Sequence, residues 1–232
     1  GAFDYTTDAN GNAVLTDART TDTTAATGGG DVIVSGGGTT DNVVLGGVGD
    51  DRINQPPRPN TNDPAGATSS GEDVVLGDNG FVTWDTSERI TTFGSTEPGL
   101  GGDDLIAVGD GDNVVIGGFG NDTIATGAGS DVVVGDNGEA TYIPGTTDLA
   151  QIKTTDATNA TGGNDMITTG DGDNVVLGGV GADTVTAGSG TDTIIGDNGQ
   201  IDWTPAGGNG TVQTTDPTLG GDDVVNAGDG SN

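Results

Sequence analysis

The sequence predicts an all-β protein whose short parallel strands wind into a right-handed coil. One reason is a nine-residue period without gaps from Gly99 to Val134, favouring glycine at positions 2 and 4, Asp or Asn at 6 and a branched aliphatic residue at 8. A second is that 47 of the 232 residues are glycine, which suits tight turns between very short strands. A third is that 3% of the residues are aromatic and 30% hydrophobic, too few for a large globular core.

The nine-residue units fall into blocks, and each complete block closes on Gly-Asp-Asn-Gly. The segments between blocks have alternating side chains and central turn residues such as Pro144-Gly145, which is typical of a β-hairpin. Both ends resemble parts of further blocks, so we expect a piece of a longer protein. In order, we expect a hairpin tail at 1–25, a block at 26–80 with a proline-rich insertion at 55–67, a hairpin at 81–98, a block at 99–138, a hairpin at 139–159, a block at 160–199, a hairpin at 200–217 and the start of a truncated block at 218–232.

Within each unit, the glycines let the first six residues form a turn whose carbonyl oxygens face inward. Residues 7 to 9 then form a strand, in which alternate side chains point to opposite faces. Because successive strands fall on opposite sheets, each unit should stack on the next but one. Position 8 fills the interior, and the residues expected there are Ile106, Val115, Ile124, Val133, Ile167, Val176, Val185 and Ile194.

The outer faces of the two predicted sheets differ. Even-numbered units place aliphatic pairs there, such as Val114 and Ile116, whereas odd-numbered units place mainly small or polar residues. An exposed aliphatic sheet of that size is normally covered. We therefore predict that the hairpin residues Trp84, Tyr142 and Trp203 lie over the even sheet.

Composition excludes several classes of function. The chain carries 36 acidic residues against five basic ones, a formal net charge of −31, which makes nucleic acid and anionic membrane surfaces poor partners. It has no cysteine and no histidine, which excludes disulfides, thiolate metal sites and catalysis by imidazole. No segment approaches the ~20 apolar residues of a membrane span. We expect no nucleic-acid binding, no membrane insertion and no enzymatic activity.

Aspartate at position 6 predicts the binding of a hard divalent cation. Stacked coils place one carboxylate above another beside turn carbonyls, and calcium tolerates such irregular, carbonyl-rich coordination better than magnesium does. A cation would also offset the self-repulsion of the chain. The predicted pairs are Asp31 with Asp51, Asp104 with Asp122, and Asp165 with Asp183, and the full set of aspartate ligands is Asp31, Asp51, Asp73, Asp104, Asp122, Asp131, Asp165, Asp183, Asp192 and Asp223.

Further residues are expected to act as weaker or supporting ligands. Asparagine replaces aspartate in the second unit of every block, and an amide oxygen brings no charge, so we expect weaker calcium sites at Asn42, Asn113 and Asn174. Turn carbonyl ligands are expected at Gly102, Gly118, Gly120, Gly129, Gly163, Gly179, Gly181 and Gly190. Counting stacked pairs gives about three calcium ions per full block.

The closing Gly-Asp-Asn-Gly allows two interpretations. Asn-Gly is the typical pair of a type I′ turn. Alternatively, Asp78, Asp136 and Asp197 are calcium ligands at the end of their blocks.

The contiguous units GLGGDDLIA, VGDGDNVVI, GGFGNDTIA and TGAGSDVVV, with a second gap-free run from Ala160 to Ile195, resemble the RTX (repeats-in-toxin) family of secreted bacterial calcium-binding proteins. The resemblance covers the blocks, more than half of the chain. It implies a parallel β-roll that is disordered without calcium and folds when it meets millimolar calcium outside the cell. It also implies export by a one-step, type I route.

We therefore expect a secreted or surface-attached bacterial segment, such as part of an adhesin or surface-layer protein, whose partners are calcium ions and neighbouring repeats of the same polypeptide. A cell-surface or glycan ligand is a further expected partner. The first alternative is a secretion and folding module of an exported enzyme. The second is a carbohydrate- or ice-binding module that uses exposed threonine rows or aromatic residues.

Overall fold

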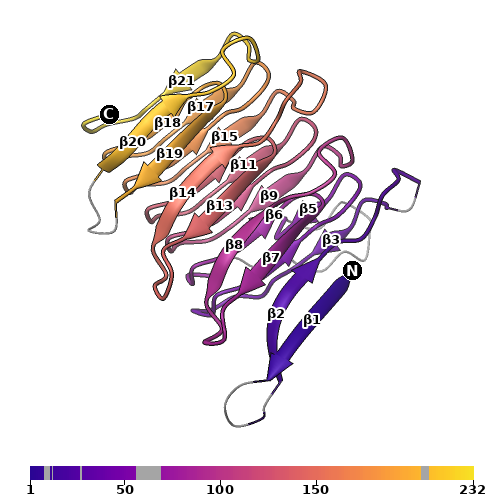
Figure 1. The fold of residues 1–232 in the computed structure, drawn as a ribbon. Coiled ribbons are helices and arrows are strands. Elements are labelled where there is room, and N and C mark those ends of the chain that lie inside the picture. Colours follow the sequence, from indigo (N-terminus) through magenta and orange to yellow (C-terminus); the bar gives the residue numbers. More distant parts are fainter. Residues whose placement is uncertain (8–10, 12, 27, 56–68, 205–208) are drawn as a thin grey trace.

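The computed structural model describes residues 1–7, 11, 13–26, 28–55, 69–204 and 209–232. These residues form 21 strands in three sheets, and no helix occurs among them (Figure 1). The chain is an all-β parallel β-roll, as its repeats predict. Most of the expected proline-rich insertion lies outside the described residues.

Two of the sheets are parallel and form the two sides of the roll. The even sheet contains β4 (Val43–Leu45), β6 (Val74–Leu76), β10 (Val114–Ile116), β12 (Val132–Val134), β16 (Val175–Leu177) and β18 (Thr193–Ile195). The odd sheet contains β3 (Val32–Ile33), β5 (Arg52–Ile53), β9 (Leu105–Ala107), β11 (Thr123–Ala125), β15 (Met166–Thr168), β17 (Thr184–Thr186) and β21 (Val224–Asn226).

The strand register confirms that each unit stacks on the next but one. Ile106 pairs with Ile124 in the odd sheet, and Val115 pairs with Val133 in the even sheet. The predicted position-8 residues form one buried cluster between the sheets. All have at most 1% exposure except Ile194, which is partly buried because it lies in the last even strand, β18.

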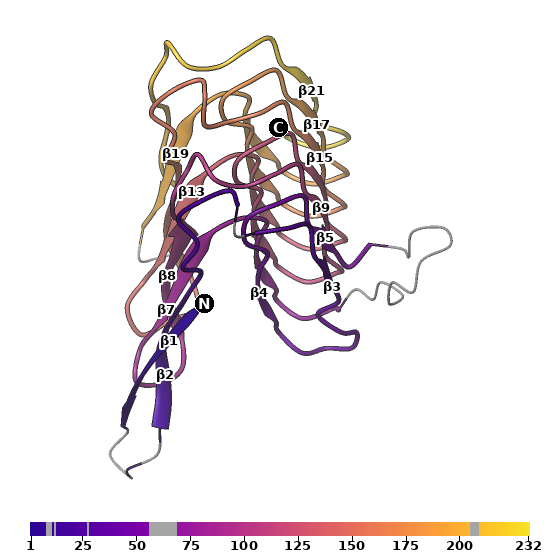
Figure 2. The same cartoon turned by 90° about the vertical axis from the view of Figure 1, so that its right-hand side faces the viewer.

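The third sheet is antiparallel and consists of four hairpins side by side. It contains β1 (Ala2–Thr7), β2 (Ala13–Arg19), β7 (Gly80–Trp84), β8 (Ile90–Ser95), β13 (Gly138–Tyr142), β14 (Leu149–Thr154), β19 (Gly199–Trp203) and β20 (Asn209–Thr214). Figure 2 shows three layers, with the even sheet between the hairpin sheet and the odd sheet. That the hairpins pair with one another into a continuous sheet was not predicted.

The hairpin sheet covers the aliphatic face of the even sheet. Val114 and Ile116 share a buried cluster with Phe93 of β8, which is fully buried. The three aromatic residues expected at this interface pack against the same cluster: Trp84, Tyr142 and Trp203. The predicted cover is therefore confirmed.

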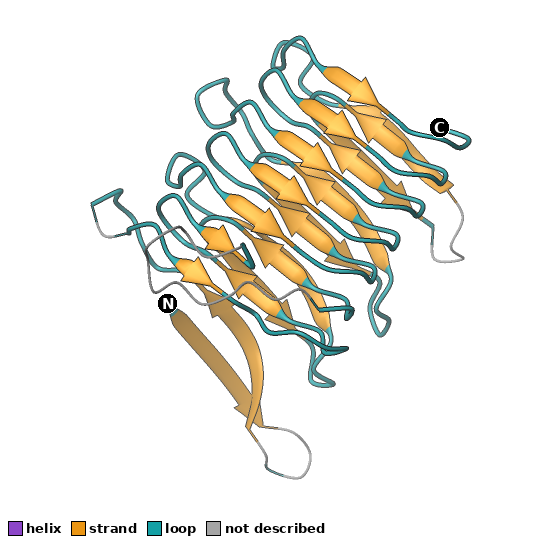
Figure 3. Ribbon diagram, turned by 180° about the vertical axis from the view of Figure 1, so that it is seen from behind, coloured by secondary structure: helices purple, strands orange, loops and turns teal. Residues whose placement is uncertain are grey.

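Each of the last three hairpins is an insertion into a turn of the roll. Gly77 precedes a hairpin and donates its N–H to Ile116 O at 2.9 Å, and Gly117, at the start of an uninterrupted turn, donates to Val134 O at 2.9 Å. The two glycines occupy the same place in successive coils. Strand β9, which follows the hairpin, pairs with β5 before it and β11 after it, so the roll continues past the hairpins (Figure 3).

The type I′ interpretation of the closing Asn-Gly pairs is wrong. Such a turn needs positive φ at both central residues, and neither Asn79 nor Gly80 has positive φ. Instead, Gly80 begins β7, where a Cβ would overlap the Leu76 side chain and approach Gly94 O. Glycine is needed there because the hairpin lies so close to the roll.

Candidate metal centres

Position-6 side chains stack into one continuous row along the odd side of the roll. Each aspartate after the first accepts, through Oδ1, the backbone N–H of the position-6 residue in the preceding coil, at 2.7–2.9 Å. The row includes all three predicted pairs and also connects one pair to the next. The backbone N–H of Asp51 donates to Asp104 Oδ1, and that of Asp122 donates to Asp165 Oδ1. In order it contains Asp31, Asp51, Asp104, Asp122, Asp165, Asp183 and Asp223.

In five aspartates of this row, the second carboxylate oxygen is buried without a hydrogen-bond partner. Such an orphaned oxygen costs free energy unless a cation or proton compensates it. Seven described position-6 aspartates have an orphaned Oδ2: Asp51, Asp104, Asp122, Asp131, Asp165, Asp183 and Asp192.

The glycine that directly follows an even strand shapes the space beside each orphaned oxygen in the odd row. A Cβ on Gly117 would overlap both Asp122 Oδ2 and the carbonyl oxygen of Gly135 in the next coil. The same clash recurs for Gly135 against Asp165. A carboxylate oxygen and a backbone carbonyl therefore meet at a space kept free of side chains, which fits an oxygen-ligated cation.

The pKa values of these carboxyl groups show the electrostatic consequence. Burial, reinforced by neighbouring carboxylates, raises the pKa of Asp104 to about 8. Burial raises the pKa values of Asp51 and Asp183 to about 6, and those of Asp122 and Asp165 well above the usual range. Ionising these carboxyl groups in the folded chain is thus unfavourable without cations and becomes favourable when divalent cations lie beside them.

The donor set resembles a calcium site of the carbonyl-rich kind. Within the described part of the chain, no three carboxylates converge into a cage made of side chains alone. Each coil instead brings one carboxylate and turn carbonyls, and hard oxygen donors of this type suit calcium. The residues present therefore fit the ion that the repeats imply.

A match to known repeats agrees with this geometry. Residues 98–139 and 159–194 match the family model of the RTX calcium-binding nonapeptide repeat, in four copies. These two segments are RTX calcium-binding repeats. Comparisons with curated proteins and with solved structures found no match.

The position-6 residues on the even side of the roll, the even row, are of two kinds. The same ladder of N–H to Oδ1 bonds, at 2.9–3.1 Å, joins its position-6 residues, and it brings Asn113 onto Asp131 and Asn174 onto Asp192. Asparagine and aspartate alternate along the row, which contains Asn42, Asp73, Asn113, Asp131, Asn174, Asp192 and Asn232. Asp73 differs from the other two aspartates because its Oδ2 accepts the Ser69 hydroxyl at 2.7 Å.

The aspartates of the closing tetrapeptides lie against the odd turns of the RTX coils. Asp78 accepts backbone N–H groups from two coils, Gly102 at 3.1 Å and Phe119 at 2.5 Å. Asp136 does the same with Gly163 and Val180, and Asp197 accepts the backbone N–H of Gly221 at 3.0 Å. Burial, with repulsion from position-6 carboxylates, raises the pKa values of Asp78 and Asp136 to about 10. Their role as calcium ligands stays a prediction.

The glycines expected to supply carbonyl ligands stack in the RTX turns. A Cβ on Gly120 would overlap the carbonyl oxygen of Gly102, and one on Gly163 would overlap that of Gly120. Stacking of the same kind places Gly181 on Gly163, Gly129 on Gly111 and Gly190 on Gly172, while Gly118 and Gly179 abut Asp78 and Asp136. The glycines beside Oδ2 were not among the expected site residues, although their signal is that each directly follows an even strand, as Gly117 and Gly77 do.

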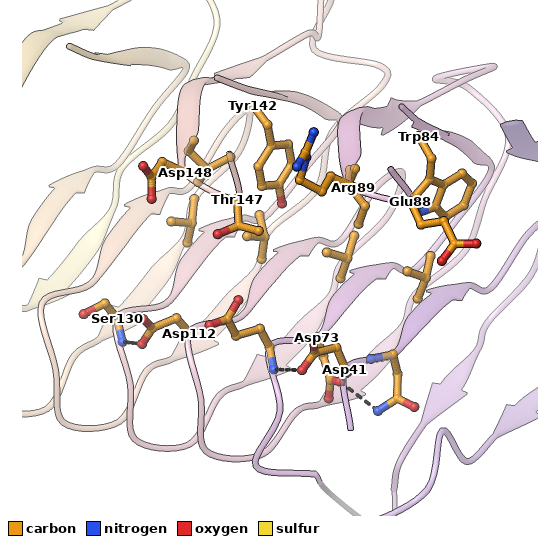
Figure 4. Close-up of a pocket in the computed structure, with 18 residues that line it drawn as sticks. Asp41, Asp73, Trp84, Glu88, Arg89, Asp112, Ser130, Tyr142, Thr147 and Asp148 are labelled. Carbon is orange, nitrogen blue, oxygen red and sulfur yellow. Dashed lines mark hydrogen bonds between the residues drawn. The ribbon is translucent and has the colours of Figure 1, made fainter. Parts of the chain in front are cut away.

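A groove of about 500 Å³ lies between the hairpins and the even turns of the roll (Figure 4). Its hairpin side carries Trp84 and Tyr142, and its opposite side carries Asp41 and Asp112. Burial and the nearby Glu72 carboxylate raise the pKa of the Tyr142 phenol. A second groove of about 290 Å³ includes Trp203, so the arrangement recurs at the next hairpin.

The described part of the chain contains no helix long and apolar enough to cross a membrane.

Proposed function

We propose that this chain is a structural segment of a large secreted or surface-attached bacterial protein, such as an adhesin, and that extracellular calcium folds and stiffens it. The observation that supports this most is the set of buried position-6 carboxylates with an orphaned Oδ2, for example in Asp104 and Asp122. Bound calcium would offset their charge, and the folded roll then becomes the favoured state.

Mass action gives the expected size of this effect. Extracellular calcium modules commonly bind with dissociation constants of ~10⁻⁴ M. At tenfold excess of calcium over that value, each site stabilises the fold by about 1.4 kcal/mol. Seven independent sites would together supply about 10 kcal/mol, comparable with the whole stability of an ordinary domain. At submicromolar calcium this contribution vanishes, so the chain would stay unfolded inside the cell.

A calcium titration tests this function. Circular dichroism and the scattering radius should show an expanded chain in chelator at neutral pH and a compact, β-rich chain at millimolar calcium. Magnesium at the same concentration is the control, and it should not replace calcium. A chain that is already compact and β-rich in chelator at neutral pH would refute the proposal.

The recurring groove favours carbohydrate binding as a second candidate function. Aromatic side chains such as Trp84 offer an apolar face with a polar edge, which suits sugar rings, and polar residues such as Thr147 and Asp148 line the same groove. Glycan-array binding that is lost on Trp84→Ala and kept on Tyr5→Ala would support this function. Tyr5 is a matched control because it lies on the outermost hairpin strand and is 63% exposed.

A further inference from the structure

We propose that asparagine at position 6 takes the place of a calcium ion, so that the even row holds calcium at aspartate coils and none at asparagine coils. This inference rests on the calcium binding proposed above. It assigns different ion contents to the two sides of the roll.

The amide group of Asn113 lies among oxygen atoms. Its Nδ2 is 3.0 Å from Gly109 O, 2.8 Å from Gly111 O and 2.9 Å from Asp131 Oδ1. Asn174 repeats the arrangement with Gly170 O, Gly172 O and Asp192 Oδ1, at 3.0–3.1 Å. Both side chains are fully buried. One N–H₂ group thus meets two turn carbonyls and one carboxylate, the kinds of oxygen that would bind calcium.

The backbone ladder fixes the orientation of each amide. Asp73 donates its backbone N–H to Asn113 Oδ1 at 3.0 Å, and Asp131 donates to Asn174 Oδ1 at 3.1 Å. Only the oxygen of an amide accepts a hydrogen bond, so the oxygen must face the preceding coil and the nitrogen must face the carbonyls. The hydrogen atoms on that nitrogen would repel a cation in the same place.

Aspartate at position 6 has no N–H group to offer where asparagine has its amide nitrogen. Asp131 and Asp122 use Oδ1 in the ladder as the asparagines do, but their second atom is an orphaned oxygen. Asparagine therefore supplies N–H groups where aspartate supplies an oxygen that needs a cation. Two even-row aspartates keep such an oxygen, Asp131 and Asp192, because Asp73 Oδ2 accepts the hydroxyl of Ser69.

The two rows would therefore differ in their need for calcium. The odd row would need a cation at each of its enclosed coils, whereas the asparagine coils of the even row are satisfied by the chain itself. In the folded roll, the asparagine coils of the even row would then need no calcium ion, and the number of calcium ions that the molecule requires would fall.

The test compares the calcium content of isosteric variants of the full chain. Native mass spectrometry and titration calorimetry should show one more ion per molecule for Asn113→Asp, one more for Asn174→Asp and two more for the double variant. Asp122→Asn should bind one ion fewer. Asn164→Asp is the matched control, because Asn164 is exposed at position 5 and its variant should bind as many ions as the wild type.

Unchanged ion content in the position-6 variants, with a β-rich spectrum retained, would overturn this inference and leave the proposed function intact. A wild-type chain that binds no calcium would overturn both. A second measurement needs no variant: in the calcium-loaded wild type, the side-chain amide protons of Asn113 and Asn174 should exchange slowly with solvent. Fast exchange would also overturn the inference.

Discussion

At the residue scale, the identity of one atom decides what each coil requires. Aspartate and asparagine share the ladder bond through Oδ1, and they differ only in whether the second atom is an oxygen or an N–H₂ group. The sequence predicted the aspartate sites from their spacing. It could not predict the orientation of Asn113, because that depends on which backbone N–H the neighbouring coil presents.

Gly117→Ala tests the space beside an orphaned oxygen. The added methyl group would overlap Asp122 Oδ2 and Gly135 O, so we expect one calcium ion fewer per molecule and a loss of about 1–3 kcal/mol in the calcium-loaded free energy of unfolding. Gly29→Ala is the control, since a Cβ there has no atom within 4 Å. Calcium content and calcium-loaded unfolding should be measured for both, and equal behaviour of the two variants would contradict the assignment.

Calcium-free stability should fall as pH rises. Burial raises the pKa of Asp104 to about 8 and that of Asp78 to about 10, whereas a free aspartate titrates at about 4. Between these values the folded chain binds more protons than the unfolded chain, so its free energy of unfolding decreases with increasing pH. In chelator, β-structure measured by circular dichroism should be strongest near about pH 4 and lost by about pH 8.

Saturating calcium should reverse this trend, because protons compete with the metal for the same oxygens. Calcium-free stability that instead increases over the same pH window would show that these carboxylates are not buried as described.

At the element scale, the hairpins cover the aliphatic face of the even sheet, which would otherwise be exposed to solvent. The alternating aliphatic pattern was enough to predict that something covers this face, and the aromatic residues identified what does. The pairing of neighbouring hairpins could not be predicted, because it depends on the rise of the roll between insertions. That rise places β8 beside β13 and β14 beside β19.

Phe93→Ala should weaken this layer. Phe93 has 0% exposure in the cluster between the hairpins and the even sheet, so we expect a loss of about 3–5 kcal/mol in calcium-loaded stability. Phe3→Ala removes the same ring from a site that is 62% exposed and should cost less than about 0.5 kcal/mol. Chemical denaturation at saturating calcium measures both, and similar losses would mean that the hairpins do not protect the even sheet.

At the scale of the whole molecule, the roll is continuous although the sequence divides into blocks. The blocks are visible in the sequence because hairpins interrupt the nine-residue period. The odd row nevertheless passes through three interruptions with bonds of ordinary length, Asp51 to Asp104, Asp122 to Asp165 and Asp183 to Asp223, at 2.7, 2.8 and 2.9 Å. Each of the three sheets runs along the stack, and one row of carboxylates follows the odd side. This continuity supports a single stiff segment rather than separately folded blocks joined by flexible linkers.

The measurement that tests the central claim most directly is anomalous scattering from crystals grown in millimolar calcium. We predict anomalous peaks next to the Oδ2 atoms of the seven position-6 aspartates that lack a partner, and none next to Nδ2 of Asn113 or Asn174. Peaks absent from the odd row, with water at those positions instead, would contradict the claim that calcium holds this fold together.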